Sequence, residues 1–171
     1  RGRAGGRQRE RTLTHPHHLL SAREVAEQRA IERFHRDDAG DPFVPAGGIA
    51  VERVVAMAFV NRTNQLLVMV EETPQPWKLL VYGRDRATGA LSLEQTLVLV
   101  DADGVDVRGL DLSVPADGNH VYLVSGSEDG YGLLQREAGD TWSVVGFVDN
   151  PSFFGASPVY ADGGRRLYVL A

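Results

Sequence analysis

The densest group of metal-ligating side chains in the sequence is a carboxylate-rich loop. Asp101, Asp103 and Asp106 lie within six residues around Gly104, and carboxylate oxygens are ligands that Ca²⁺ prefers. An EF-hand loop, however, requires a fixed ligand spacing that ends in a glutamate, and this loop lacks both. We interpret it as a solvated loop between strands, with a calcium site as the alternative.

A nucleophile or general base would need histidine, serine or cysteine in a recognisable setting. His120 opens an apolar stretch, and Ser127 follows Gly126 without the Gly-x-Ser-x-Gly pattern of a nucleophile elbow. The sequence has no cysteine, which removes disulfides, thiolate ligands and a cysteine nucleophile. We interpret His120 as a strand-start residue, with a catalytic role as the alternative. The sequence identifies no catalytic residue, no cofactor and no metal ligand.

Three other motifs have a structural interpretation. Residues 128–130, Glu-Asp-Gly, are typical of a turn. Residues 61–63, Asn-Arg-Thr, form a glycosylation sequon, which has meaning only in a secreted eukaryotic protein. We expect Trp77 and Trp142 to pack between structural units, with a sugar site as the alternative, because large aromatic side chains mostly serve cores and interfaces.

Charge is distributed unevenly along the chain. Residues 1–40 hold 9 arginines against 6 acidic residues, and residues 41–171 hold 9 cationic against 17 acidic residues, so the net charges are +3 and −8. The acidic part argues against a nucleic-acid partner, because phosphate neutralisation needs clustered cations. No apolar run approaches the roughly 20 residues of a membrane span, so we expect a soluble protein. The sequence does not decide the cellular compartment. The alternatives are the cytoplasm and export directed by a signal segment upstream of Arg1.

The N-terminal region is predicted to differ from the rest. Residues 1–20 are rich in Arg and Gly and contain a His-Pro-His-His run at 15–18, which indicates a disordered basic tail. An RNA-binding arginine arm and a His-rich metal site are the alternatives. Ser21 and Glu24 form a capping box, and apolar residues at helical spacing predict a helix over about 21–36 within a helix-and-linker segment of 21–38.

The periodicity changes to that of β-strands from residue 50 onward. Runs rich in Val, Leu, Tyr and Phe alternate with turn residues. Short strands at regular spacing without a helical pattern predict an antiparallel all-β domain. The predicted strands span about 50–60, 64–70, 78–84, 91–100, 109–114, 120–125, 130–136, 141–148, 156–161 and 166–171.

An internal repeat identifies the kind of all-β domain. Residues 64–69 recur as 119–124 and again as 165–170, at steps of 55 and 46 residues, and the same Ala-Asp-Gly turn precedes the second and third copies. Four short strands per period of about 50 residues are typical of a β-propeller blade. A β-sandwich is the alternative, although sandwiches do not normally repeat their internal sequence.

The repeat also carries a family resemblance. Its elements are an Asp-Gly loop at 103–106, Pro-Ala-Asp-Gly at 115–118, the strand 120–124, Asp-Gly at 129–130 and, in the earlier copy, Arg-Asp followed by Thr-Gly at 84–89. Residues 103–149 resemble the lactonase-type seven-bladed β-propeller family with YVTN-like repeats, also described as 6-phosphogluconolactonase-like. The resemblance implies lactone hydrolysis at a central channel, with residues drawn from several blades.

The number of strands limits what this segment can do alone. Residues 50–171 account for about two blades and the first two strands of a third, so we expect a fragment of a longer propeller, with ring closure by several short chains as the alternative. A binding or interaction scaffold is the preferred function, with an unknown protein or small-molecule ligand at the ring face or channel. A hydrolase that opens a sugar lactone is the alternative. We expect the first strands to face the channel near Val54 and Gly109.

Overall fold

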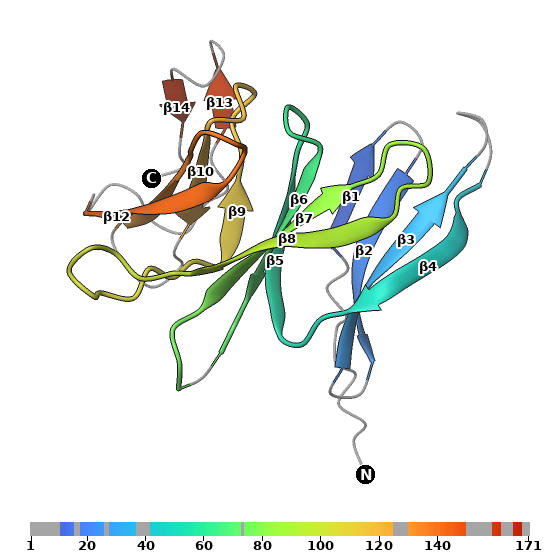
Figure 1. Ribbon diagram of the computed structural model, residues 1–171, viewed down its shortest axis with the longest axis horizontal. Helices are drawn as coiled ribbons and strands as arrows, with labels where there is room; N and C mark the ends of the chain where they lie inside the picture. Colours follow the sequence, from blue (N-terminus) through green and yellow to red (C-terminus); the bar gives the residue numbers. More distant parts are fainter. Residues whose placement is uncertain are drawn as a thin grey trace. The chain divides into compact units, whose positions relative to one another are not determined.

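The computed structural model describes residues 11–15, 18–25, 28–36, 42–72, 74–124, 130–149, 159–161 and 166–168. Every regular element in these residues is a β-strand (Figure 1). The strands form three four-stranded sheets and one two-stranded sheet, and the predicted all-β class is confirmed. None of the described segments is a helix long and apolar enough to cross a membrane. The chain divides into two compact units, Arg1–Arg53 and Val54–Ala171.

The first unit contains an antiparallel meander in which each strand pairs with the next along the chain. Its strands are β1 (Arg11–His15), β2 (His18–Val25), β3 (Gln28–His35) and β4 (Val44–Ala50). The β3–β4 register shifts between Glu32 and Phe34. Gly47 lies opposite this shift with φ of +100°, a conformation that glycine adopts at little cost, and the extra residue forms a β-bulge.

The helix predicted over about 21–36 is wrong. These residues contribute to β2 and β3, which stay in register from His18↔His35 to Val25↔Gln28. The segment is rich in Ala, Glu, Arg and Gln, which favour helices by less than about 1 kcal/mol per residue. Pairing with β1 and β4 outweighs that preference, because strand formation depends on the neighbouring strands. The strands β1 and β2 also occupy residues 11–15 and 18–20 of the predicted disordered tail, whereas residues 1–10 lie outside the described residues.

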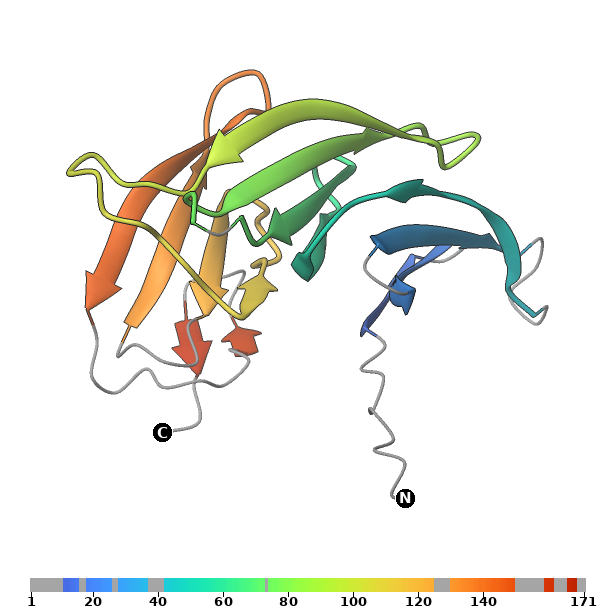
Figure 2. The same cartoon turned by 90° about the horizontal axis from the view of Figure 1, so that it is seen from below.

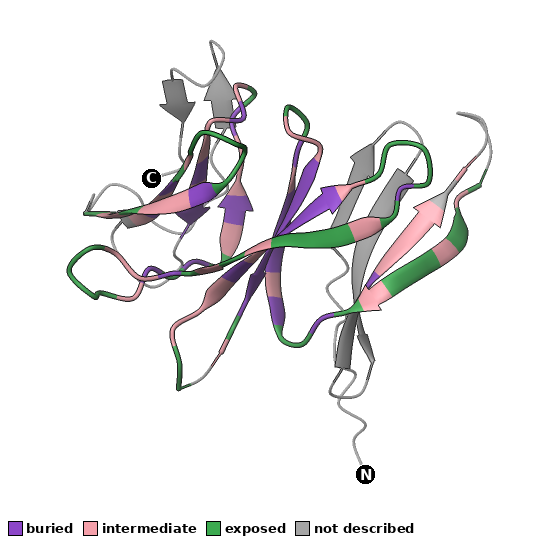
Figure 3. Ribbon diagram, viewed as in Figure 1, coloured by how far each residue is buried: buried purple, intermediate pink, exposed green. Residues whose placement is uncertain are grey.

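The second unit begins with a meander of four strands. These are β5 (Val54–Val60), β6 (Gln65–Val70), β7 (Lys78–Arg84) and β8 (Leu91–Val98). All six residues of β6 are buried, whereas β8 is mostly half-exposed or exposed. This difference follows the strand order, because β6 is an inner strand of its sheet and β8 is an edge strand (Figure 3).

A second meander of the same kind follows along the chain. It consists of β9 (Asp111–Ser113), β10 (His120–Val124), β11 (Gly130–Arg136) and β12 (Trp142–Asp149). The last strand pair of each meander has a register shift at the same place, between Val81 and Tyr82 in one and between Leu133 and Leu134 in the other. The two sheets therefore repeat each other in detail as well as in topology.

The apolar core of the second unit lies between these two sheets, which Figure 2 shows beside each other. It is formed by side chains from β5, β6 and β7 on one side and from β9, β10, β11 and β12 on the other, together with Leu99 and Val107 from the segment between the sheets. The most deeply buried members are Val60, Leu67, Met69, Leu79, Val81, Leu99, Val107, Val121, Leu123 and Leu134, each 0% exposed.

The predicted repeat is confirmed by the strand pairing. The three repeated segments form β6, β10 and β14 (Arg166–Tyr168), each of which is the second strand of its sheet; β13 (Val159–Ala161) is the first strand of the last pair. All ten strands expected after residue 50 are present within a few residues of their predicted bounds. Residues 50–171 were predicted to form about two blades and the first two strands of a third, and the second unit has two four-stranded sheets and one further strand pair, as in a partial β-propeller. The first unit contains another four-stranded meander, which the sequence did not predict.

Candidate functional site

The second unit has two ends of different character. Its meanders place four short turns at one end, residues 61–64, 85–90, 114–119 and 137–141, which we call the turn end. The opposite end, which we call the connector end, carries residues 71–77 and the 12-residue connector 99–110 between the two sheets. Longer loops on a rigid scaffold are where binding groups usually reside.

The connector is an ordered structure. Leu99 and Val107 are both fully buried, and the Val107 N–H donates to the Leu99 carbonyl at 2.8 Å. Val100 and Asp106 form a β-bridge beyond this pair. The connector is thus a small hairpin that is anchored in the core at its base and projects its tip outward (Figure 1).

The carboxylates predicted as a loop or calcium site lie in this hairpin. The Asp101 carboxylate accepts hydrogen bonds from the backbone N–H groups of Asp103 and Val105, both at 2.9 Å. The Asp106 carboxylate pairs with Arg108 at 2.5 Å. Asp101 therefore stabilises the tip of the hairpin, and Asp106 pairs locally with a cation on its own arm of the chain. Among the described residues, no three His, Cys, Asp or Glu side chains gather in a group that could hold a metal ion.

The first-strand starts named from the sequence lie at this same end. Val54 opens β5 and is 5% exposed. Gly109 precedes β9 and is buried, and a Cβ at this position would lie 2.9 Å from the Leu123 Cβ and 3.0 Å from the Leu123 carbonyl carbon. Only glycine lets the backbone of the connector approach β10 this closely.

The histidine weighed as a catalytic residue lies at the turn end. His120 opens β10, and its Nδ1 lies 3.8 Å from Asp117 Oδ2. Its position in the sheet is that of Gln65, the first residue of β6. Its interpretation as a strand-start residue is confirmed. Ser127, Glu128 and Asp129 lie outside the described residues.

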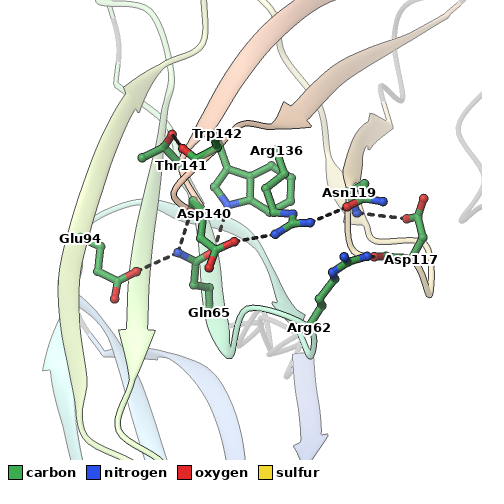
Figure 4. Close-up of polar contacts among 10 residues, drawn as sticks. Arg62, Gln65, Glu94, Asp117, Asn119, Arg136, Asp140, Thr141 and Trp142 are labelled. Atoms are coloured by element: carbon green, nitrogen blue, oxygen red, sulfur yellow. Dashed lines mark hydrogen bonds and ion pairs between the residues drawn. The ribbon is translucent and has the colours of Figure 1, made fainter.

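A polar contact between the two sheets is the best-defined arrangement at the turn end (Figure 4). Gln65 is the one buried polar residue among the side chains that the structure describes, at 4% exposure. Its Oε1 accepts a hydrogen bond from the Trp142 Nε1 at 3.1 Å, and its Nε2 donates to the Asp140 carbonyl at 3.0 Å and to Glu94 Oε2 at 2.8 Å. A buried amide with both ends satisfied costs little and fixes its partners.

A second glutamine completes this contact, which we call the seam. The Gln95 side chain donates to the Trp142 carbonyl at 2.7 Å and accepts from the Trp142 N–H at 2.8 Å. It thereby imitates the two hydrogen bonds of a neighbouring strand. Trp142 is 2% exposed and packs in the core, and Trp77 is partly buried against the same core. The prediction that both tryptophans pack between neighbouring sheets is confirmed.

The β5–β8 sheet and the β9–β12 sheet each also carry one asparagine–arginine pair. The asparagine lies in the turn before the second strand, and the arginine lies at the end of the third strand. Arg84 Nη1 donates to Asn64 Oδ1 at 3.0 Å, and Arg136 Nη2 donates to Asn119 Oδ1 at 2.7 Å. Arg136 also pairs with Asp140 at 2.5 Å. The pairs tie the two middle strands of each sheet together. Burial lowers the pKa of the Arg84 guanidinium, and Arg86 lowers it further by charge repulsion.

The sequon lies in the turn between β5 and β6. Asn61 and Arg62 are exposed, and Arg62 Nη1 donates to the Asp117 carbonyl of the neighbouring sheet at 3.2 Å. Figure 4 shows the polar contacts from Gln65 to Asp140, from Asp140 to Arg136 and from Arg136 to Asn119, and the separate contact from Arg62 to Asp117. The turn end is thus occupied by contacts that join sheets, and sequence reasoning missed both glutamines of the seam. Gln65 had a signal, because it is the one polar residue in an otherwise apolar strand. Gln95 had none, because β8 also contains Ser92, Glu94 and Thr96.

Comparisons with known proteins give structural matches only. No protein-family model matches the chain, and no curated protein matches it in sequence. A functionally unknown protein from Desulfotomaculum acetoxidans matches with a TM-score of 0.69 at 14% identity, over 93% of this chain and 47% of that one.

Two further solved structures have names that describe an activity. A candidate 6-phosphogluconolactonase from Bacteroides fragilis matches with a TM-score of 0.64 at 17% identity, over 95% of this chain and 47% of that one. The periplasmic gluconolactonase of Pseudomonas aeruginosa matches with a TM-score of 0.61 at 13% identity, over 90% and 47%. The chain spans about half the length of these structures. At such low identity the matches show the fold alone, and they agree with the partial β-propeller that the strand order indicates.

Proposed function

We propose that the chain is part of a lactonase-like propeller protein that hydrolyses a sugar lactone. The observation that supports this most directly is the match of 90–95% of the chain to a candidate 6-phosphogluconolactonase and to a gluconolactonase. The internal repeat and its resemblance to the lactonase-type propeller family point the same way. The binding scaffold preferred on sequence grounds has no comparable support.

The reaction defines what the site must supply. A water oxygen bonds to the lactone carbonyl carbon, the ring C–O bond breaks, and the released alkoxide takes up a proton to give the hydroxy acid. The water must be activated by a basic group or a metal ion, and the carbonyl oxygen must be stabilised as it gains charge. The chain spans about half of the matched structures, so we propose that other parts of a longer protein complete this site.

We place the proposed site at the connector end. That end carries the longest connection of the second unit and an anchored hairpin. Arg108, which follows the hairpin, has a side chain that is 52% exposed while pairing with Asp106. A guanidinium in this position can approach a lactone oxygen that gains negative charge.

The test is a hydrolysis assay with the intact protein that contains this chain. Proton release is followed in a pH-stat with glucono-1,5-lactone and with its 6-phosphate, against spontaneous hydrolysis in the same buffer. We expect turnover of at least one lactone, well above the uncatalysed rate. A protein that binds either lactone without hydrolysing it would instead be a scaffold, and the proposal would be wrong.

A matched pair of arginine variants tests the location of the site. Arg108→Ala removes an exposed arginine at the connector end, and Arg86→Ala removes an exposed arginine at the turn end. We expect kcat/KM to fall by about 10-fold or more in the first variant, as for loss of a charged contact to the reacting group. The second variant should hydrolyse the lactone like the wild type. Equal effects in both variants would contradict a site at the connector end.

A further inference from the structure

His120 lies at a position whose role the preceding sheet reveals. In the β5–β8 sheet, Asn64 is followed by Gln65, and Gln65 reaches across to the next sheet. In the β9–β12 sheet, Asn119 is followed by His120. The register is also the same, because Gln65 pairs with the residue before Arg84 and His120 with the residue before Arg136.

The backbone frame around the two residues is equivalent. The Arg84 N–H donates to the Asn64 carbonyl at 3.0 Å, and the Arg136 N–H donates to the Asn119 carbonyl at 2.8 Å. The side-chain asparagine–arginine pairs repeat as well. The backbone thus places the first residue of the second strand in the same way in both sheets.

The chemistry of the two side chains is similar despite their different shapes. Gln65 uses one acceptor, toward the Trp142 indole N–H, and one donor, toward the Asp140 carbonyl. A neutral imidazole also offers one acceptor and one donor. The His120 Nδ1 lies 3.8 Å from Asp117 Oδ2, and the His120 side chain is 39% exposed. The ring therefore retains hydrogen-bonding capacity for another partner.

We infer that His120 is the contact residue of a second seam, toward the sheet that β13 and β14 begin. The partner is a four-stranded sheet of the same kind, which offers a backbone carbonyl and an N–H donor at the start of its fourth strand, as Asp140 and Trp142 do. This inference rests on the proposal that the chain belongs to a longer propeller.

The rest of the second seam differs from the first. The register shift leaves one residue without a partner on the neighbouring strand, Glu94 in β8 and Val145 in β12. The residue that follows it is Gln95 in β8 and Gly146 in β12. Val145 is 50% exposed. The second seam therefore has an apolar contact where the first has a carboxylate, and His120 is its central polar member.

The experiment compares four variants of the intact protein by thermal unfolding. His120→Ala removes the donor and acceptor, His120→Gln restores both in the manner of Gln65, Gln65→Ala is the reference for a known seam, and Asp117→Asn tests the neighbouring carboxylate. We expect His120→Ala to lower Tm by about 2–4 °C or more, in the direction of Gln65→Ala. His120→Gln should stay within about 1 °C of the wild type, a shift well below that of one hydrogen bond.

Two results would overturn the inference. If His120→Ala and His120→Gln both unfold like the wild type, His120 only faces solvent. If both variants lose stability equally and Asp117→Asn reproduces the loss, His120 acts through Asp117 within its own turn. Lactone hydrolysis by the wild type is measured separately, so that a protein without lactonase activity but with the expected pattern of Tm would refute the function and retain the seam.

Discussion

The seam between the two sheets of the second unit makes a quantitative prediction at Gln65. Replacing Gln65 with alanine removes three hydrogen bonds, to Trp142, Asp140 and Glu94, at 2.8–3.1 Å. Each neutral hydrogen bond contributes about 0.5–1.5 kcal/mol net, and an indole N–H left buried without a partner costs about 1–3 kcal/mol. The bond to exposed Glu94 adds little, because water can replace it. We therefore expect Gln65→Ala to lower the free energy of unfolding by about 2–4 kcal/mol.

A double-mutant cycle isolates the bond to the indole. Trp142→Phe removes the N–H while keeping an aromatic side chain in the core, and its effect is measured in the wild type and in Gln65→Ala. The coupling energy should be about 0.5–1.5 kcal/mol if the 3.1 Å bond is present in solution. Gln95→Ala serves as the comparison, because Gln95 bonds to the backbone of Trp142 and its loss should not depend on the indole N–H.

The assay is urea unfolding of the intact protein, followed by circular dichroism at constant m-value. A loss below about 0.5 kcal/mol for Gln65→Ala, together with no coupling to Trp142→Phe, would mean that water reaches the seam. The reasoning from burial would then be refuted, since it depends on Gln65 being sealed from solvent at 4% exposure.

Two other predictions concern a close contact and a pH dependence. A Cβ on Gly132 would lie 2.4 Å from the Val107 Cγ1, so Gly132→Ala should lower the free energy of unfolding by about 1–3 kcal/mol. Adding Val107→Ala to this variant should recover part of the lost stability. If the two substitutions instead destabilise the double variant additively, the contact between these residues is contradicted. Hydrogen bonds from the Thr88 backbone and hydroxyl lower the pKa of Asp85 from its usual 3.8, so its stabilisation is complete above about pH 4 and is lost as pH falls through the lowered pKa. Asp85→Asn should flatten the acid side of the stability curve in unfolding experiments between about pH 2 and pH 5, and an unchanged slope would mean that the turn at Asp85 is open in solution.

The strands after residue 50 could be predicted because their sequence and their environment agree. The segments that form β6 and β10 are apolar, rich in Val and Leu, and preceded by turn residues. Repetition of the whole unit then identified a blade, because only a stack of similar sheets gives the same sequence pattern at this period. Local preference and global fold point to the same structure in this part of the chain.

The first sheet could not be predicted, because its strands have sequences that favour other structures. β3 contains Ala30, Glu32 and Arg33, which suit a helix, and β4 contains Pro45 and the Gly47–Gly48 pair, which suit a turn. Gly48 faces the Ile31 carbonyl so closely that an added Cβ would lie 2.5 Å from the oxygen. Gly48 is therefore needed where β3 and β4 approach each other.

The seam was missed for a different reason. A glutamine in a strand is ordinarily an exposed residue, and nothing in the local sequence indicates that Gln65 reaches a tryptophan 77 residues away. The asparagine–arginine pairs had a detectable signal, because Asn64 with Arg84 and Asn119 with Arg136 recur at equivalent places in the repeat. Comparing repeats thus reveals contacts within a sheet more readily than contacts between sheets.

The seam at Gln65 and the proposed second seam at His120 differ in their side chains, and this difference has a structural consequence. The core between two sheets is apolar and has little directionality, so it permits small shifts of one sheet against another. Hydrogen bonds from Gln65 and Gln95 to Trp142 are satisfied in one relative position only, and unsatisfied buried polar groups penalise any other position. His120, Val145 and Gly146 stand where Gln65, Glu94 and Gln95 stand in the preceding sheet, so the two sheets carry different side chains at equivalent positions. Such differences distinguish sheets that have the same fold. Packing is favoured between two sheets whose polar groups can satisfy each other's hydrogen bonds.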